Sequence, residues 1–151
     1  MSESFRGCRG RKVISRASAS DLGVVSHLLV DTQRRQVAAV VIGSGRKTQL
    51  VDWGGLSGFG PDAVMVADEA ALRPPGDDGE RAAADGKLEL VGKKALSDRG
   101  NELGKIDDVT FDADTGTLED LIIGDRRIPA GSLLGCGSYA AVLEERQEDL
   151  G

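Results

Sequence analysis

The chain has few of the residues on which most catalytic and metal-binding sites depend. Its 151 residues include one histidine, His27, and two cysteines, Cys8 and Cys136. A single histidine cannot build a catalytic triad or a metal site unaided, and the two cysteines show neither metal-ligand spacing nor a disulfide framework. We therefore predict no enzyme activity, no cofactor and no metal, with a reducing cytoplasm as the compartment. We expect His27 to be a strand residue with one hydrogen bond; pH sensing is the alternative.

Long apolar runs are also missing. No segment approaches the roughly 18 apolar residues that a membrane-spanning helix needs. The first fifteen residues, MSESFRGCRGRKVIS, contain no apolar core of a signal peptide. The net charge of −6 argues against general nucleic-acid binding, so we expect no specific DNA partner.

Aromatic residues make up only 3% of the chain and there are 4 prolines, whereas glycine is abundant at 21 residues. Glycines between short apolar runs are typical of an all-β protein with many turns. The segment AVVIGSGRKTQLVDW, residues 39–53, shows the pattern. It lacks the glycine before the Lys-Thr pair that a phosphate-binding loop requires, and no helix start follows. This segment therefore predicts a β-hairpin.

The sequence repeats itself at a nearly constant spacing. The stretch KVISRASASDLGVVSHLLVD resembles KALSDRGNELGKIDDVTFD further on, with Leu22-Gly23 and Leu103-Gly104 lying 81 residues apart. The segment VAAVVIG is followed 81 residues later by LEDLIIG, and beyond the hairpin the spacing falls to 77. Each copy predicts the same series of short strands, which indicates a duplicated unit.

Residues 74–86, PPGDDGERAAADG, contain no Val, Ile, Leu or aromatic residue and predict a linker. The linker separates a first unit at residues 5–73 from a second at residues 87–146, and residues 147–151 form an acidic tail. Five or six short strands in about 65 residues would curl into a small, strongly twisted barrel. Because barrels this small bury little apolar surface, we expect them to pack on each other or on a partner.

The acidic stretch DDVTFDADTGTLED, residues 107–120, resembles a calcium loop only superficially. Its glycine stands at the fifth position from Asp112 instead of the sixth, and the twelfth position is Ile123. We predict a hairpin in which Asp112 accepts backbone hydrogen bonds and Gly116 takes a positive φ.

The first sixteen residues carry five basic side chains and one acidic one. This basic arm would contact a partner or acidic lipid head groups; the alternative is a solvated chain end. Trp53, at a strand end, would either bind a partner or pack between the two units. The residues predicted to bind a partner are Arg6, Arg9, Arg11, Lys12 and Trp53.

The second copy, GKKALSDRGNELGKIDDVTFDADTGTLEDLIIGDRRIPAGSL, resembles the PRC-barrel domain. The matching motif residues are Leu103-Gly104, Asp108, Phe111-Asp112, Thr115-Gly116 and Ile128-Pro129. The first copy matches less well, because TQRR replaces the Thr-Gly turn and VDW replaces the Ile-Pro segment. The resemblance implies an all-β fold of two SH3-like barrels in tandem, with five to six strands each and a pseudo-two-fold relation.

Similar domains occur in the cytoplasmic part of the H subunit of purple-bacterial reaction centres, in a ribosome-maturation factor and beside magnesium-transporter regulatory regions. The resemblance therefore implies a non-enzymatic adaptor for a larger assembly. We expect the cytoplasmic face of a membrane electron-transfer or transport complex, with the protein cytoplasmic or peripheral at the inner membrane face. The alternatives are a domain that senses a small molecule or metal between the barrels, and a ribosome-associated assembly factor. Either a monomer or a homodimer fits the sequence.

Overall fold

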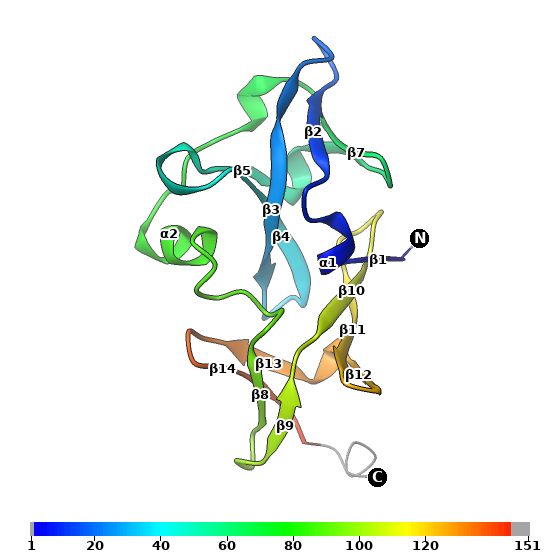
Figure 1. Cartoon of the computed structure of the whole chain (residues 1–151), viewed down its shortest axis with the longest axis vertical. Helices are drawn as coiled ribbons and strands as arrows, with labels where there is room; N and C mark the ends of the chain where they lie inside the picture. The colour runs from blue at the N-terminus through cyan, green and yellow to red at the C-terminus, as the bar shows by residue number, and fades with distance from the viewer. Residues whose placement is uncertain (1, 146–151) are drawn as a thin grey trace.

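The computed structural model describes residues 2–145, and strands dominate it (Figure 1). The first repeat forms a six-stranded sheet in the order β5-β4-β3-β2-β7-β6, in which β2 and β7 are parallel and the other neighbours are antiparallel. Its strands are β2 (Lys12–Ser15), β3 (Asp21–Asp31), β4 (Gln36–Ile42), β5 (Gln49–Asp52), β6 (Leu56–Phe59) and β7 (Ala63–Val66).

The second repeat has the same strand order, distributed over two four-stranded sheets, β13-β14-β8-β9 and β1-β10-β11-β12. Its own strands are β8 (Lys94–Ser97), β9 (Glu102–Lys105), β10 (Asp108–Asp112), β11 (Leu118–Ile123), β12 (Arg126–Pro129), β13 (Leu133–Cys136) and β14 (Ala140–Leu143). The long strand β3 corresponds to β9 and β10 together, which are separated by two residues outside the strands, the buried Ile106 and Asp107. The predicted all-β tandem fold is confirmed, and the repeats lie one above the other along the long axis (Figure 1).

Short helices connect and precede the strands. Two are α-helical, α1 (Phe5–Cys8) and α2 (Asp78–Ala84), and the 3-10 helices are η1 (Gly45–Lys47), η2 (Trp53–Gly55), η3 (Glu69–Ala71) and η4 (Ala130–Ser132). Each helix within residues 2–145 is too short to reach across a bilayer. The hairpin predicted for residues 39–53 is confirmed, since β4 and β5 pair with Ile42 opposite Gln49 on either side of η1.

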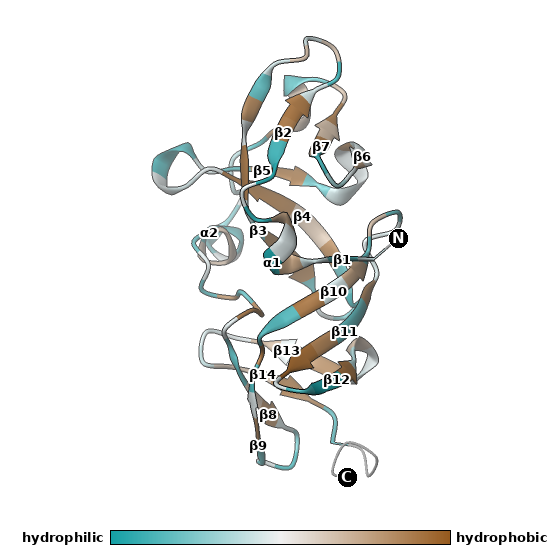
Figure 2. Ribbon diagram, turned by 45° about the vertical axis from the view of Figure 1, so that its right-hand side comes forward, coloured by the Kyte–Doolittle hydropathy of each residue, from teal (hydrophilic) through white to brown (hydrophobic). Residues whose placement is uncertain are grey.

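Hydrophobic residues gather in the strands while the turns are hydrophilic (Figure 2). In β10, Val109 and Phe111 are fully buried and the residues between and beside them are not, as expected for a strand with one face toward the core. In β4 the run from Ala39 to Ile42 is buried throughout, because both faces of the strand are covered. Val40 and Ile42 face the main core, and Val41 packs in a second cluster with Leu50 and with Ala84 of the segment after the first repeat.

Each repeat contains one glycine that the packing of the sheet requires. Gly23 has φ +129° and a Cβ there would stand 2.8 Å from Ile42 Cγ2; Gly104 has φ +124° and a Cβ there would stand 2.9 Å from Ile123 Cγ2. Both the backbone angle and the close side chain exclude a larger residue. This explains why Leu-Gly recurs at the same place in both copies.

The acidic hairpin of the second repeat has the predicted turn. The Asp112 carboxylate accepts the backbone N–H groups of Asp114 at 2.8 Å and Thr115 at 3.3 Å, and Gly116 has φ +78°. Asp31, the equivalent residue of the first repeat, accepts two backbone N–H groups of its own turn at 3.1 Å. The two turns are therefore built in the same way.

These two turns meet and join the repeats. An antiparallel bridge links Gln36 to Thr117, which are equivalent residues 81 positions apart. The flanking hydrogen bonds run from Val37 N–H to the Gly116 carbonyl (2.8 Å) and from Leu118 N–H to the Arg35 carbonyl (2.9 Å). The donors Val37 and Leu118 are equivalent residues of the two repeats, and so are the acceptors Arg35 and Gly116. Exchanging the repeats therefore turns one bond into the other, which means that a local two-fold axis passes through this bridge. The predicted pseudo-two-fold relation is confirmed.

The segment that precedes the first strand of each repeat covers the other repeat; we call these segments, residues 2–11 and 76–93, the lead-in segments. β1 (Ser2–Ser4) pairs with β10, and α1 places Phe5 and Cys8 in the core against β10. Ahead of the second repeat, α2 packs on β3, where His27 Nε2 donates to the Ala83 carbonyl at 2.9 Å. The N-terminal segment is therefore not a solvated end, because residues of it are buried between the repeats.

The segment predicted as a linker contains α2. Asp77 caps this helix by accepting the Glu80 N–H at 2.7 Å, while the Glu80 carboxylate accepts the Gly76 N–H at 2.7 Å. The same carboxylate binds the Arg73 guanidinium at 2.6 Å, and Arg73 also reaches Asp52 of β5 at 2.8 Å. Arg73 thereby fastens α2 to the first repeat. The predicted domain bounds stay a prediction, and the acidic tail at residues 147–151 lies outside the described residues.

Replacing Gly104 tests the requirement for glycine. We expect Gly104→Ala to lower the free energy of unfolding by about 2–4 kcal/mol, because the methyl group adds a clash to an unfavourable φ. The matched control is Gly100→Ala, which has φ +87° but open space around its Cβ, so it should cost only about 1–2 kcal/mol. Urea unfolding measures both; equal losses would show that the contact with Ile123 does not matter.

The Arg73–Glu80 pair predicts a dependence of stability on acid pH. The Arg73 guanidinium, with the Gly76 N–H, lowers the pKa of Glu80 from 4.5 to about 2. A carboxyl whose folded pKa is depressed stabilises the fold above its unfolded pKa, and this contribution is lost as the pH falls from 4.5 towards 2. Because both side chains are about a third exposed, solvent screening keeps the contribution near ~1 kcal/mol.

We expect Glu80→Gln to destabilise the protein at neutral pH and to lose most of that difference as the pH falls to about 2. Unfolding in urea at both pH values measures it. Glu69→Gln, at an exposed position of η3, controls for the removal of one negative charge. A Glu80→Gln defect that stays the same in acid would contradict the assignment.

Candidate functional site

Four aromatic rings from different parts of the chain meet where the repeats join. Phe111 of β10 contacts Phe5 at 5.6 Å, Phe59 at 5.4 Å and Trp53 at 6.1 Å between ring centroids, each in edge-to-face geometry. A Cβ at Gly116 would stand 2.8 Å from the indole of Trp53. Trp53 of the first repeat therefore packs on the second repeat. This is the packing alternative of the sequence prediction; its binding of a partner stays a prediction.

The basic residues near the N-terminus have partners inside the molecule. Arg6 Nε donates to the Asp107 carbonyl, and the Arg6 N–H donates to the Asp108 carboxylate at 3.1 Å. Arg9 pairs with Glu89, in the segment that leads into the second repeat. Two basic side chains of the arm thereby link the N-terminal segment to the second half of the chain.

The other two predicted contact residues are also paired. The Arg11 guanidinium is only 10% exposed, bonds Glu3 at 3.0 Å and lies 5.4 Å from the centre of the Phe59 ring. Lys12 pairs with Asp21 at 2.8 Å and remains 63% exposed. Arg6 and Arg9 thus connect the two repeats, whereas Arg11 and Lys12 pair within the first half of the chain. Contact of the arm with a partner or with anionic lipid stays a prediction.

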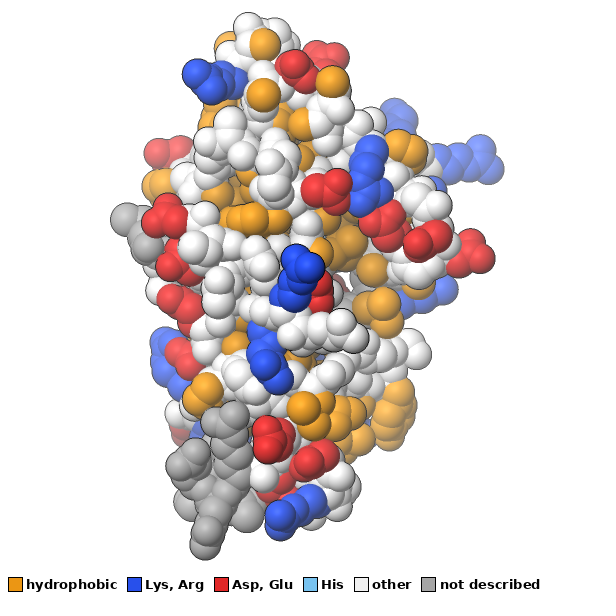
Figure 3. Space-filling view, turned by 180° about the vertical axis from the view of Figure 1, so that it is seen from behind, with side chains coloured by type: hydrophobic (Ala, Val, Ile, Leu, Met, Phe, Trp, Pro, Cys, Tyr) orange, Lys and Arg blue, Asp and Glu red, His pale blue; other side chains and the backbone are white. Residues whose placement is uncertain are grey.

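The exposed outer face of the sheet β13-β14-β8-β9 is the clearest candidate interaction surface. Tyr139 is 73% and Leu134 47% exposed, and both stand on the β13–β14 hairpin. In Figure 3 hydrophobic side chains reach the surface at the lower right, over the end of the molecule that carries β13 and β14. We call this surface the Tyr139 face and define it by Lys94, Leu96, Lys105, Leu134, Tyr139 and Val142.

Sheet register determines which residues share the Tyr139 face. Lys94 is opposite Lys105 in the β8–β9 pair, and Leu96 is opposite Val142 in the β14–β8 pair. The Lys94 ammonium lies 5.2 Å from the centre of the Tyr139 ring and within 3.5 Å of Glu102. The cation–π contact fixes the direction of the lysine and keeps its charge at the surface.

The equivalent face of the first repeat has a different character. The outward-facing Lys12, Ile14 and Met65 correspond to Lys94, Leu96 and Val142. Where the second repeat exposes Leu134 and Tyr139, however, the first has Ser57 and Asp62. The first repeat exposes Val24 instead, at 42%, on β3. Only a comparison of the two copies position by position would have found Tyr139 and Leu134 from the sequence.

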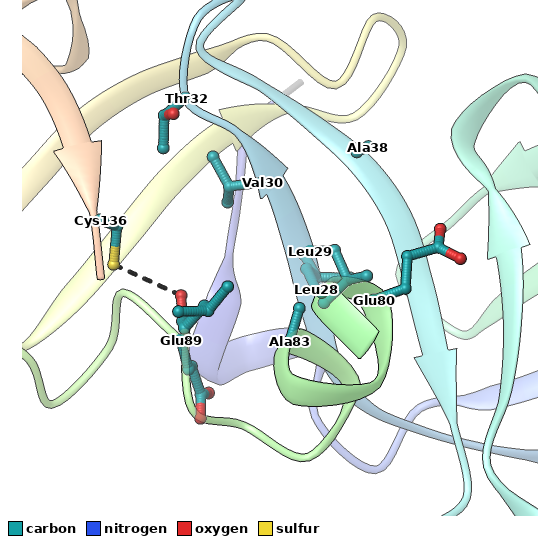
Figure 4. A pocket seen from close by; sticks show the side chains of 11 residues that line it. Leu28, Leu29, Val30, Thr32, Ala38, Glu80, Ala83, Glu89 and Cys136 are labelled. Carbon is teal, nitrogen blue, oxygen red and sulfur yellow. Dashed lines mark hydrogen bonds between the residues drawn. The ribbon is translucent and has the colours of Figure 1, made fainter. Parts of the chain in front are cut away.

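A second feature is a groove of about 330 Å³ where α2, β3 and β4 face the second repeat. Figure 4 shows Val30, Ala83 and Cys136 around one space, from β3, α2 and β13. The groove is lined by Leu28, Leu29, Val30, Thr32, Ala38, Gly79, Glu80, Ala83, Leu88, Glu89 and Cys136. Most of these side chains are apolar, and the two carboxylates are bound by Arg73 and Arg9.

The two thiols and the histidine are placed for structural roles. Burial raises the pKa of the Cys8 thiol to about 11, and burial also raises the pKa of Cys136 despite the nearby Lys93. Both thiols are therefore protonated at neutral pH, which makes them poor nucleophiles and metal ligands. His27 has the one hydrogen bond predicted for it, and burial lowers its pKa. Over residues 2–145, no three His, Cys, Asp or Glu side chains gather closely enough to hold a metal ion.

Comparison with known proteins places both repeats in one family. The family model described as the PRC-barrel domain matches residues 4–72 and 88–137, which together are more than half of the chain. The two matched segments begin shortly before the first strand of each repeat and include the equivalent turns at Asp31 and Asp112. No curated protein matches the chain. PRC-barrel domains are generally non-catalytic interaction modules. The chain belongs to the PRC-barrel domain family, with two copies of the domain in tandem.

Proposed function

We propose that this protein is a non-enzymatic adaptor that docks on a larger protein assembly through the Tyr139 face. The observation that carries the proposal is the exposure of Tyr139 and Leu134 on one hairpin beside lysines. Among residues 2–145, Val24 is the one other exposed large hydrophobic side chain, at 42%. The family supports the same class of function, since its domains generally serve protein interaction.

The chemistry of the Tyr139 face suits a protein partner. A tyrosine loses little conformational entropy when it is bound, offers a large apolar ring and keeps a hydroxyl for hydrogen bonding, which is why tyrosines are frequent hot spots. Leu134 and the half-buried Leu96 and Val142 extend the apolar area. Lys94 and Lys105 supply positive charge at its edge, so a partner with acidic groups around an apolar centre would be complementary.

The joined repeats would present this face rigidly. Three features connect the two halves: the hydrogen-bonded turns around Gln36 and Thr117, the lead-in segments that pack on the opposite repeat, and the ring cluster. Binding would therefore cost little ordering of the protein itself, which favours affinity.

We further propose that the assembly lies at the cytoplasmic face of a membrane electron-transfer or transport complex. This finer statement rests on the family resemblance, and the lysines of the Tyr139 face are compatible with a site near anionic lipid. A ribosome-associated role is less favoured because the chain carries a net charge of −6.

Capture experiments with paired variants test the docking face. The tagged chain, expressed at its native level, is recovered under gentle conditions together with detergent-solubilised membranes, and bound proteins are quantified by mass spectrometry. We expect Tyr139→Ala combined with Leu134→Ser to reduce the stoichiometric partner at least about tenfold, because both changes remove a hot spot. Exposed substitutions such as these should change stability by less than about 0.5 kcal/mol.

The pseudo-symmetry supplies the controls. Val24→Ser removes the exposed hydrophobic residue of the first repeat, and Lys12→Glu matches Lys94→Glu at the equivalent position. We expect Lys94→Glu to weaken capture and both first-repeat variants to leave it unchanged, a result that for Lys12 would also overturn the partner contact predicted from the sequence. Undiminished capture by the Tyr139→Ala/Leu134→Ser variant would refute the assignment of this face, and recovery of the wild-type chain alone would refute the adaptor function.

A further inference from the structure

The groove and the ring cluster occupy equivalent places on the two sides of the molecule. Backbone hydrogen bonds establish the correspondence: Gly10 N–H donates to the Val25 carbonyl, and Gly92 N–H donates to the Ile106 carbonyl in the same way. The lead-in segments therefore correspond at a spacing of 82, the central strands at 81 and the strands after the hairpin at 77. The two junctions between the repeats can thus be compared side chain by side chain.

At one junction the rings fill the space, and at the other small side chains leave it open. On the filled side, Phe59 and Phe111 are 5.4 Å apart and Trp53 lies 5.6 Å from Phe59. Each ring has a non-aromatic equivalent. The corresponding pairs are Phe5 and Lys87, Trp53 and Ala130, Phe59 and Cys136, and Phe111 and Val30. Val30 and Cys136 line the groove of about 330 Å³.

We propose that this groove is a binding site for a neutral planar aromatic compound of one or two rings. Equivalent strands line both junctions, and Val30 and Cys136 line the groove where Phe111 and Phe59 pack against each other on the other side. Helix α2, which has no equivalent on the ring side, forms a further wall of the groove. An apolar cavity of about 150 Å³ suffices to bind benzene, so the groove has room for a fused two-ring system.

The lining of the groove selects the chemical class. Leu28, Val30, Ala83 and Leu88 provide apolar walls, which favour a hydrophobic ligand over a polar one. Thr32 offers a hydroxyl for one hydrogen bond. The two carboxylates of the lining, those of Glu80 and Glu89, are paired with Arg73 and Arg9, and the described residues of the lining include no lysine or arginine. This lining therefore offers no positively charged side chain of its own to an anionic ring compound such as an aromatic acid.

The position of the site connects it to the rest of the molecule. One wall is α2, which Arg73 fastens to the first repeat, and another is Cys136, whose Sγ donates to the Leu88 carbonyl at 3.4 Å. Cys136 ends β13, the strand that also carries Leu134 of the Tyr139 face. A bound ring would therefore contact both repeats and the hairpin next to the proposed docking face.

Indole serves as the test compound, because it is neutral, planar and bicyclic. We expect indole at about ten times its dissociation constant to raise the melting temperature of the full chain by about 3 °C. The methyl NMR signals of Leu28 and Val30 should shift in the same titration, whereas those of Val24 should not. An unchanged melting temperature and unchanged methyl signals at saturating indole would overturn the proposal.

Two variants separate filling of the groove from other effects. Cys136→Phe restores the ring that stands at the equivalent position, Phe59, and should abolish the indole response; Cys136→Ser keeps the space open and should retain it. If Cys136→Phe does not fold, Val30→Phe, which restores the equivalent of Phe111, replaces it. An indole response that survives a correctly folded filling variant would overturn the site.

The outcome is independent of the docking experiment. If the groove is a separate site, the Tyr139→Ala/Leu134→Ser variant should lose partner capture and still respond to indole. If wild-type protein ignores indole while Cys136→Phe abolishes partner capture, the groove accepts an aromatic side chain of the partner and the small-molecule site is refuted.

Discussion

The antiparallel bridge between Gln36 and Thr117 is the contact on which the arrangement of the molecule depends. It joins equivalent turns of the two repeats, and the two flanking hydrogen bonds are related by exchange of the repeats. Because these turns pair with each other, the central strand that leads into each turn lies beside the lead-in segment of the opposite repeat. The ring cluster and the groove follow as the two junctions on either side of the same axis.

The two junctions show how a duplicated unit becomes asymmetric without changing its backbone. At Gly116 the absence of a side chain admits the indole of Trp53. At the equivalent position, Arg35 keeps the left-handed backbone with φ +52° and donates through Nε to the Leu133 carbonyl at 3.1 Å. Hydrophobic rings thus fill one junction. At the other junction, the Arg35 hydrogen bond spans part of the space and a groove remains. The hydrogen-bonding frame is common to both, while side-chain volume decides what each junction can hold.

Features encoded by neighbouring residues were predictable, and features that depend on distant contacts were not. The Asp112 turn with Gly116, the hairpin at residues 39–53 and the repeat itself follow from local turn chemistry and strand patterns. The helix α2 had a local signal as well, since Asp77 and Glu80 form a capping pair before three alanines, but its lack of large apolar residues suggested a linker. Charge pattern alone could not reveal that Arg6, Arg9 and Arg11 bind groups in the fold, because their partners lie far away or include backbone carbonyls. The Tyr139 face and the groove are visible in the sequence only as departures of one copy from the other.

The exchange of lead-in segments has a consequence for what counts as a unit in this protein. Residues 2–8 stand before the first repeat in sequence, but the buried Phe5 and Cys8 pack against β10 of the second, just as the helix before the second repeat covers the first. A cut drawn between the repeats along the chain would leave each half missing the piece that its neighbour supplies. Neither half is self-sufficient, so loss of structure in one should propagate to the other, and the pair should melt as a single cooperative body.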